Sequence, residues 1–264
     1  MPRFDVAVLL AIAVPLAGLG QMPKMGDFSG YEKLDRAQAL ERIAHGAPVD
    51  LKSTDLSGDD LSGVDFHRAD LTAAVLNGAV LARANLSDCN LTVSFGEHAD
   101  LRDANLHHAE LFSMQLGGAD LRGANLSDAR FIGDLRSADL RGANLARLRA
   151  AADMKNQSMG LMHAVISSAR LDDANLQDAD VARADFSFSS LAGANLRGAH
   201  AYAADFSGVS LQHANLAHAD LHEAKFIDTD FSGANLEGAD FTGAVFRNVR
   251  GLDTANRKGA RGLP

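Results

Sequence analysis

The chain has 264 residues, 47% of them hydrophobic, with 24 glycines, five prolines, no tryptophan and one cysteine. A single cysteine excludes an intramolecular disulfide. The net charge of -9 at pH 7 excludes direct nucleic-acid binding through the charge of the chain as a whole, because such binding needs a groove or stripe rich in lysine and arginine.

Residues 1–20 read as a signal peptide or an N-terminal anchor. Arg3 precedes an apolar stretch from Val6 to Leu19, and glycines at its end supply small residues for cleavage. The stretch is shorter than the roughly 20 residues that a membrane span requires. We therefore expect export to a periplasm. Contact with a membrane is expected only if the segment stays uncleaved, and a cytoplasmic protein only if Met22 or Met25 is the true start.

Residues 21–48 are interpreted as a linker and a capping helix. Ser29 and Glu32 match a capping box, an approximate apolar stripe follows, and Gly46 with Pro48 marks the end of the helix. We expect this short helix to lie over one end of the repeat domain that follows it, because the open ends of stacked strands need covering.

A large apolar residue recurs every fifth position in two runs. From Leu51 to Phe131, 16 of 17 such positions are Leu or Phe, and from Leu161 to Phe246, 17 of 18 are Leu, Ile, Val or Phe, so chance is excluded. A period of five fits neither a helix, whose period is 3.6, nor a flat strand, whose period is 2. Each unit reads as a short extended edge with the small and the large residue pointing inward, followed by a corner.

Asparagines recur at a longer interval, at every twentieth position, which corresponds to four units of five. Four edges therefore close one square coil, and residues one such interval apart stack in a β-solenoid. Stacked asparagine side chains can hydrogen-bond along such a column, whereas stacked aspartates would repel one another. The predicted structural column contains Asn85, Asn105, Asn125, Asn144, Asn175, Asn195, Asn215 and Asn235.

The two runs join into one solenoid, predicted at residues 49–248. Phe131 is followed by Leu135 after four residues instead of five, which is a one-residue deletion. The step from Asn144 to Asn175 exceeds one full coil by eleven positions, so an 11-residue loop leaves the coil, at about residues 147–160. Residues 249–264 are predicted to form a basic C-terminal tail, which covers the last coil or trails free.

The run Ala-Asp-Leu-Arg-Gly-Ala-Asn-Leu at residues 119–126 and 138–145 resembles the pentapeptide-repeat family. The resemblance covers roughly 200 residues. It implies an all-β fold, a right-handed quadrilateral β-helix, here with about 9 to 10 coils. It implies little about function, because the fold of this family carries unrelated roles.

The sequence provides no catalytic constellation. No phosphate-binding loop, Cys/His metal spacing or nucleophile elbow is present. No histidine has a histidine partner one coil away within either run, which argues against a metal site on one face. The columns Asp88–His108–Asp128 and Asp180–His200–Asp220 are interpreted as exposed ion pairs. We therefore expect no enzyme activity, no catalytic residue, no metal and no cofactor.

The remaining hypothesis is an exported structural or protein-interaction scaffold with an acidic surface and an unidentified protein partner. The candidate partner-binding loop contains Arg147, Arg149, Lys155 and Met159. The alternative follows from the resemblance, which includes acidic DNA mimics that bind type II topoisomerases and confer quinolone resistance. For that alternative the protein would have to be cytosolic. The sequence names neither the partner nor the oligomeric state.

Overall fold

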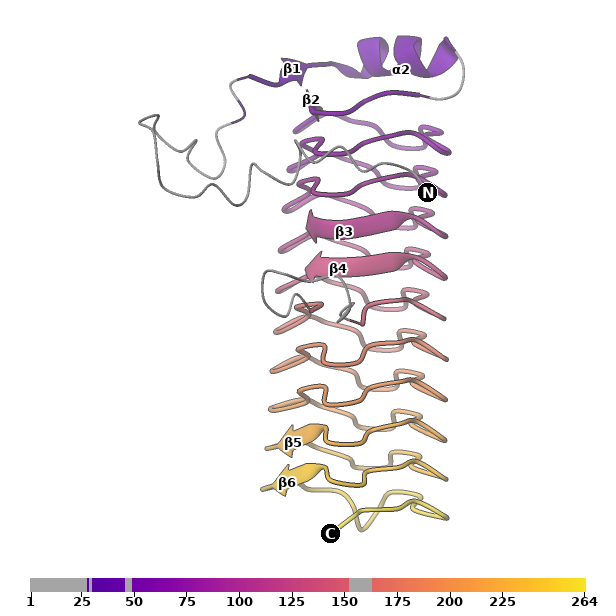
Figure 1. Cartoon of the computed structure of the whole chain (residues 1–264), viewed down its shortest axis with the longest axis vertical. Coiled ribbons are helices and arrows are strands. Elements are labelled where there is room, and N and C mark those ends of the chain that lie inside the picture. The colour runs from indigo at the N-terminus through magenta and orange to yellow at the C-terminus, as the bar shows by residue number, and fades with distance from the viewer. Residues whose placement is uncertain (1–27, 29, 46–48, 152–162) are drawn as a thin grey trace, which may run out of the picture. The chain divides into compact units, whose positions relative to one another are not determined.

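The computed structural model describes residues 28, 30–45, 49–151 and 163–264. Residues 31–264 form one compact unit, a continuous stack of coils with a short helix at one end (Figure 1). Each extended edge is so short that most coils pair through isolated parallel bridges rather than long strands. The regular elements are β1 (Glu32–Lys33), α2 (Arg36–Ala44), β2 (Thr54–Asp55), β3 (Glu110–Gln115), β4 (Arg130–Asp134), β5 (Lys225–Ile227) and β6 (Val245–Arg247).

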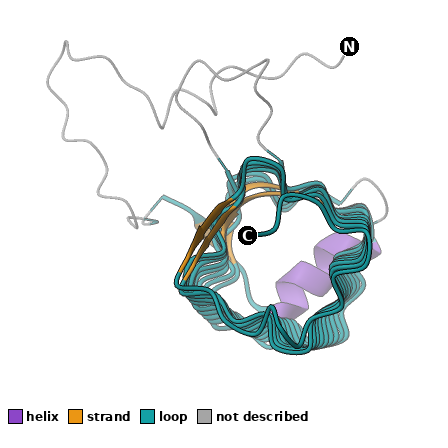
Figure 2. Ribbon diagram, turned by 90° about the horizontal axis from the view of Figure 1, so that it is seen from below, coloured by secondary structure: helices purple, strands orange, loops and turns teal. Residues whose placement is uncertain are grey.

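Successive coils pair in parallel, and most bridges join each residue to its twentieth successor. One column of bridges starts at Asp50, Asp70 and Asn90 and ends at Arg261; its eleven residues mark ten turns. Seen along the stack, the coils superpose on one four-sided outline (Figure 2). The predicted right-handed quadrilateral β-helix is thereby confirmed.

Inward side chains fill the coils. The large residue of each unit and the small residue two places before it are buried, as Leu121 and Ala119 illustrate at 0% and 1% exposure. Toward the C-terminus the rings of Phe186, Phe206 and Phe226 stack with centroid distances of 5.2 and 5.3 Å. Aromatic stacking thus follows the interval of one coil, and the buried residues form one hydrophobic cluster along the coils.

The second residue after nearly every large one turns the corner with a positive φ; Gly133, at the one-residue deletion, is an exception. In the described residues, 24 non-glycine side chains adopt this left-handed conformation, which glycine adopts without strain. Where a bulky residue occupies a corner, a glycine often stands at the same corner one coil later. The rings of His98 and Phe188, for example, lie against Gly118 and Gly208. The glycines therefore make room for side chains of the preceding coil.

Val93 is the one β-branched residue with a positive φ, 53°, in the described part of the chain. Val93→Asn is expected to raise the free energy of unfolding by about 1 kcal/mol, because asparagine tolerates the left-handed region better than a branched side chain does. Urea denaturation measures the difference. The control Ala82→Asn, at a position without positive φ, should stay within about 0.5 kcal/mol of the parent. A loss of stability in Val93→Asn would contradict this account.

The one-residue deletion and the 11-residue insertion fall on the same corner of the coil, in successive coils. Between Ile132 and Asp134, the pairing of β4 with β3 shifts by one position, at the predicted deletion. In the next coil the chain is regular as far as Ala150, whose N–H bonds to the carbonyl of Asp180, and it pairs again at Val165, which bridges to Asp134. The insertion therefore begins after Ala150, later than the expected start at residue 147.

The helix at the N-terminal end begins later than predicted. Helix α2 starts after Asp35, whose carboxylate accepts from the backbone N–H of Gln38 while the Gln38 side chain accepts from the Asp35 backbone N–H. The predicted capping box of Ser29 and Glu32 is wrong, because Glu32 lies in β1; Ser29 itself lies outside the described residues. An aspartate and a glutamine at the same spacing supply the same reciprocal bonds.

Helix α2 covers the first coil (Figure 2). Leu34 and Ala39 are 2% and 0% exposed and belong to the core cluster. Cationic side chains meet the carbonyls that face out of the first coil: Lys33 Nζ lies 2.6 Å from the Ser57 carbonyl oxygen, and Arg36 Nη1 lies 2.5 Å from that of Asp60. The segment around α2 therefore covers the core at this end of the solenoid. It also supplies hydrogen-bond donors to two backbone carbonyls of the first coil.

Residues 249–264 cover the last coil, as one of the two predicted arrangements has it, and they do so by continuing the solenoid rather than as a separate tail. Arg250, Asn256 and Arg261 bridge to residues of the preceding coil. Gly251 and Gly262, with φ of 78° and 72°, approach the backbone of that coil so closely that no Cβ atom would fit. Figure 2 shows the C-terminus inside the outline of the coils. The basic segment is thus a partial last coil over the core, because its glycines allow close approach.

Candidate functional site

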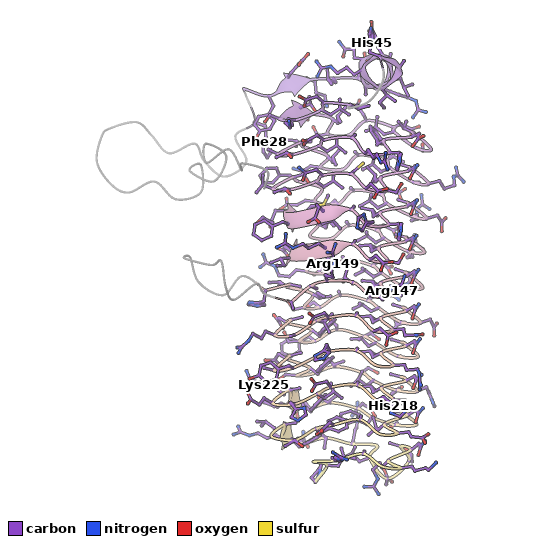
Figure 3. All side chains as sticks on the ribbon, turned by 45° about the vertical axis from the view of Figure 1, so that its right-hand side comes forward. Phe28, His45, Arg147, Arg149, His218 and Lys225 are labelled. Atoms are coloured by element: carbon purple, nitrogen blue, oxygen red, sulfur yellow. The ribbon has the colours of Figure 1, made fainter. Side chains whose placement is uncertain are left out.

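Of the four residues predicted for the partner-binding loop, the structure describes two. Arg147 and Arg149 lie on the stacked coils (Figure 3). Arg147 Nη2 is 2.6 Å from Asp128 Oδ2, and Arg149 Nη2 is 3.8 Å from Glu110 Oε1. These two arginines therefore belong to the outer wall. The other two predicted residues, Lys155 and Met159, lie outside the described residues.

A groove of about 440 Å³ lies on the wall beside the insertion corner. Its lining includes His163, Arg183, Asp185, Asp205 and Lys225. Lys225 Nζ is 3.3 Å from Asp205 Oδ2, so these charges neutralise each other. The groove offers hydrogen-bonding groups and charged groups of both signs.

One wall carries a repeated pair of aspartate and arginine, here called the arginine–aspartate face. Arg102 donates from Nε and Nη2 to the two carboxylate oxygens of Asp100, at 2.8 and 2.6 Å, and Arg122 makes the same contacts with Asp120. These hydrogen bonds hold the pKa values of both carboxyls below the ordinary 3.8. The face also contains Asp139 and Arg141, paired at 2.7 Å.

At one corner of the coil, basic and acidic side chains alternate from coil to coil. Its column runs Arg68, Asp88, His108, Asp128 and Arg147. His108 Nδ1 lies 2.8 Å from Asp88 Oδ1, as expected for an exposed ion pair. The contact with His108 keeps the pKa of Asp88 low, and the contact with Arg147 does so for Asp128. The residues compensate one another's charge on a solvated surface.

The second predicted histidine column gains a member that the sequence did not single out. His200 Nδ1 and His222 Nδ1 lie 3.2 and 2.6 Å from the two oxygens of Asp220, and His222 Nε2 lies 3.6 Å from Asp240 Oδ2. His222 follows Asp220 by two residues, the same spacing as Asp100 and Arg102. In the described residues no group of His, Cys, Asp and Glu is arranged to hold a metal ion.

The hydrogen bond with Asp220, with nearby Asp240 and Glu223, raises the pKa of His222 above its ordinary value of 6.5. Protonated His222 therefore stabilises the fold fully below pH 6.5, and the contribution is lost as pH rises through the higher folded pKa. We expect the melting temperature of His222→Gln to fall below that of the parent near pH 6 and to match it by about pH 8.

Thermal unfolding across this pH range measures the effect, and an NMR titration of the His222 ring checks the pKa. His213→Gln is the control, since the His213 ring lies against Gly233 and makes no ion pair among the described residues. Equal pH dependence of the two variants would contradict the assignment to Asp220.

The eight predicted asparagines form one column of side-chain hydrogen bonds. Seven bonds join the eight residues: each amide after that of Asn85 donates to the asparagine oxygen of the preceding coil at 3.0–3.2 Å, including the link across the insertion from Asn175 to Asn144. Two further members were missed. Asp65 accepts from Asn85 at 2.7 Å, and Asn256 donates to Asn235 at 2.9 Å. Counting back 20 residues from Asn85, one regular coil, would have found Asp65. Asn256 lies 21 residues after Asn235, so the regular interval misses it.

The single cysteine is not a reactive group. Cys89 is 1% exposed, its thiol lies 3.0 Å from the Phe66 carbonyl oxygen, and burial raises its pKa to about 12. A thiol with such a pKa carries almost no thiolate at neutral pH. Cys89 occupies an inward position that is alanine in other units.

The repeat units of this chain match a known protein family. The family model for pentapeptide repeats matches in eight copies, over residues 60–94, 79–113, 99–133, 115–147, 169–208 and 204–243. A search of curated proteins found no match. In the described residues no helix has the length and apolar character to cross a membrane.

Among solved structures, HetL from the cyanobacterium Nostoc sp. is similar to this chain with a TM-score of 0.57 and 28% identity, over 86% of this chain and 96% of HetL. HetL is a pentapeptide repeat protein involved in heterocyst differentiation regulation. The fluoroquinolone resistance protein QnrB1 aligns with a TM-score of 0.39 and 17% identity, over 87% and 88% of the two chains. That value is too low to support an argument about function.

Proposed function

Because the chain belongs to the pentapeptide-repeat family, we propose that it is a non-enzymatic, exported scaffold that binds a protein partner. The arginine–aspartate face carries this proposal. Its side chains are held by bidentate bonds at a fixed spacing from coil to coil, and Arg102 and Arg122 keep 48% and 44% of their side chains exposed. A partner that binds ordered side chains loses less conformational entropy than one that must order them.

Photo-cross-linking in cells tests the partner-binding role. A photoreactive residue in place of Arg122 is expected to capture a discrete protein. The matched control has the same residue in place of Arg197, which is exposed and lies two residues after Asn195 of the asparagine column. Absence of any captured protein from either position and from the other walls would contradict the scaffold role.

Export is proposed from the apolar stretch from Val6 to Leu19 and the preceding Arg3. Cell fractionation with N-terminal sequencing is the test. We expect a periplasmic protein that begins near residue 21; a membrane-anchored protein would retain the segment. An intact cytosolic chain would contradict export.

The alternative is a cytosolic DNA mimic that binds a type II topoisomerase, which the net charge of -9 favours. Against it, the carboxylates of Asp100, Asp120 and Asp139 are each paired with an arginine, which lowers the negative charge of that wall. A gyrase supercoiling assay with and without a quinolone separates the two proposals. Protection at micromolar protein would favour the mimic, and no effect would dismiss it.

A further inference from the structure

One aromatic ring projects from the surface of the coils. Phe188 is 72% exposed, and it is the one exposed phenylalanine among the described residues. It lies two residues after the buried Phe186, at the corner between the wall of Asp185 and the wall of Ser190. Its ring is not a member of the hydrophobic cluster that fills the coils. The exposure of this ring therefore has no explanation in the packing of the core.

The backbone of Phe188 adopts a conformation that disfavours a large side chain. Its φ is 61°, in the left-handed region, where bulky residues are uncommon. The same corner is occupied by Ser168 one coil earlier and by Gly208 one coil later. A small residue would thus occupy this corner with less strain. Because residues in strained conformations cluster at binding sites, the conformation indicates a role other than packing.

The next coil supports the ring. A Cβ atom on Gly208 would lie 2.7 Å from Cδ1 of Phe188, so the ring lies directly against the backbone of this glycine. A side chain that is already supported in the free protein loses less conformational entropy when a partner binds it. Phe188 therefore has the preorganisation expected of a binding residue.

The surface around Phe188 is uncharged. Charged residues make up 22% of the chain, but residues 186–196 and 206–219 contain no Asp, Glu, Lys or Arg. Charged residues such as Arg170 and Asp230 lie in the coils on either side. The residues beside the ring, on its own coil and on the two adjacent coils, are Ser168, Ser187, Ser190, Ser207, Gly208 and Ser210. An aromatic residue in an uncharged area with a charged rim is typical of the centre of a protein–protein interface.

We propose that Phe188 inserts into an apolar pocket of a partner protein. The pocket would take one phenyl ring and would have an uncharged rim of hydrogen-bonding groups, since the serine hydroxyls around Phe188 can both donate and accept. Burial of an aromatic ring in such a pocket is a large contribution to binding. The inference deepens the proposed scaffold role, on which it rests, because it adds a second contact surface and specifies the chemistry of the partner.

A second copy of the chain and a membrane are poorer fits. The grooves at the insertion corner, as far as the described residues line them, are mainly polar, so they do not suit the phenyl ring of a second copy. A single ring among serine hydroxyls supplies too little apolar area for stable binding to a membrane. A separate protein with an apolar pocket is therefore the occupant that the surface favours.

Photo-cross-linking in cells, followed by binding measurements with the captured protein, tests the proposal. p-Benzoylphenylalanine in place of Phe188 keeps an aromatic ring at this corner. It is expected to capture one protein, with the cross-link at residues that line an apolar pocket. The matched control carries the same residue in place of His98, which is exposed, has a φ of 56° and lies against Gly118 at the same corner of an earlier coil.

The purified partner then gives the affinity. Phe188→Ser is expected to weaken its binding about tenfold or more, because the buried ring is lost. Serine occupies the same corner at Ser168, so the variant should fold as the parent does. His98→Ser, the matched change outside the uncharged surface, should leave the affinity unchanged.

Four results would overturn the proposal: no capture at position 188, equal capture at positions 98 and 188, cross-links confined to a charged surface of the partner, or unchanged affinity in Phe188→Ser. Sedimentation velocity and phosphatidylcholine vesicles test the other occupants. Self-association or vesicle binding that is lost in Phe188→Ser, without a captured partner, would also overturn it. Capture at position 122 without capture at position 188 would reject this site alone and leave the scaffold role intact.

Discussion

Phe206→Ala is expected to lower the free energy of unfolding by about 3–5 kcal/mol. The ring is 0% exposed and is stacked between Phe186 and Phe226, nearly parallel to both, at 2° and 5°. Its removal would leave a cavity between rings whose positions are set by the coils above and below, so the surrounding structure cannot easily collapse. Urea or guanidinium denaturation followed by circular dichroism provides the measurement.

Phe188→Ala is the matched control, because this phenylalanine stands on a corner two residues after the core position and is 72% exposed. We expect a change within about 0.5 kcal/mol. Similar losses for the two variants would show that the stacked interior is not the main source of stability in this half of the solenoid.

Asn215→Asp is expected to lower the free energy of unfolding by about 1–3 kcal/mol at neutral pH. The Asn215 amide donates to Asn195 at 3.2 Å, and its oxygen accepts from Asn235 at 3.1 Å. An ionised aspartate still accepts but cannot donate. Its second oxygen would face the oxygen of Asn195 across the gap between coils, so one hydrogen bond would become a repulsive contact.

The start of the same column provides the control. Asp65 only accepts there, from Asn85 and from the backbone N–H of His67. An aspartate is tolerated at this end because no donor is required of it, and we expect Asp65→Asn to change stability by less than about 0.5 kcal/mol. Equal effects of Asn215→Asp and Asp65→Asn in chemical denaturation would show that the direction of the column is irrelevant.

The sequence by itself determined the architecture of the walls. Each wall residue pairs with its counterpart one coil earlier and its counterpart one coil later, so counting along the chain is equivalent to following the stack. For that reason the deletion before Leu135, the length of the insertion and the link between Asn144 and Asn175 were all predictable. The ion pair of His108 with Asp88 followed from the same count.

Only the tertiary structure decided what happens where the period stops. The capping box at Asp35, the cations over the first carbonyls and the close approach of Gly251 to the backbone of the preceding coil have no counterpart within the repeat. The same holds for Arg147 and Arg149, which lie on the wall because the insertion begins after Ala150. Inside the solenoid each coil packs between two similar coils, so the repeat itself specifies the contacts. A coil at an end has such a neighbour on one side only, and residues outside the repeat pattern must cover its other side.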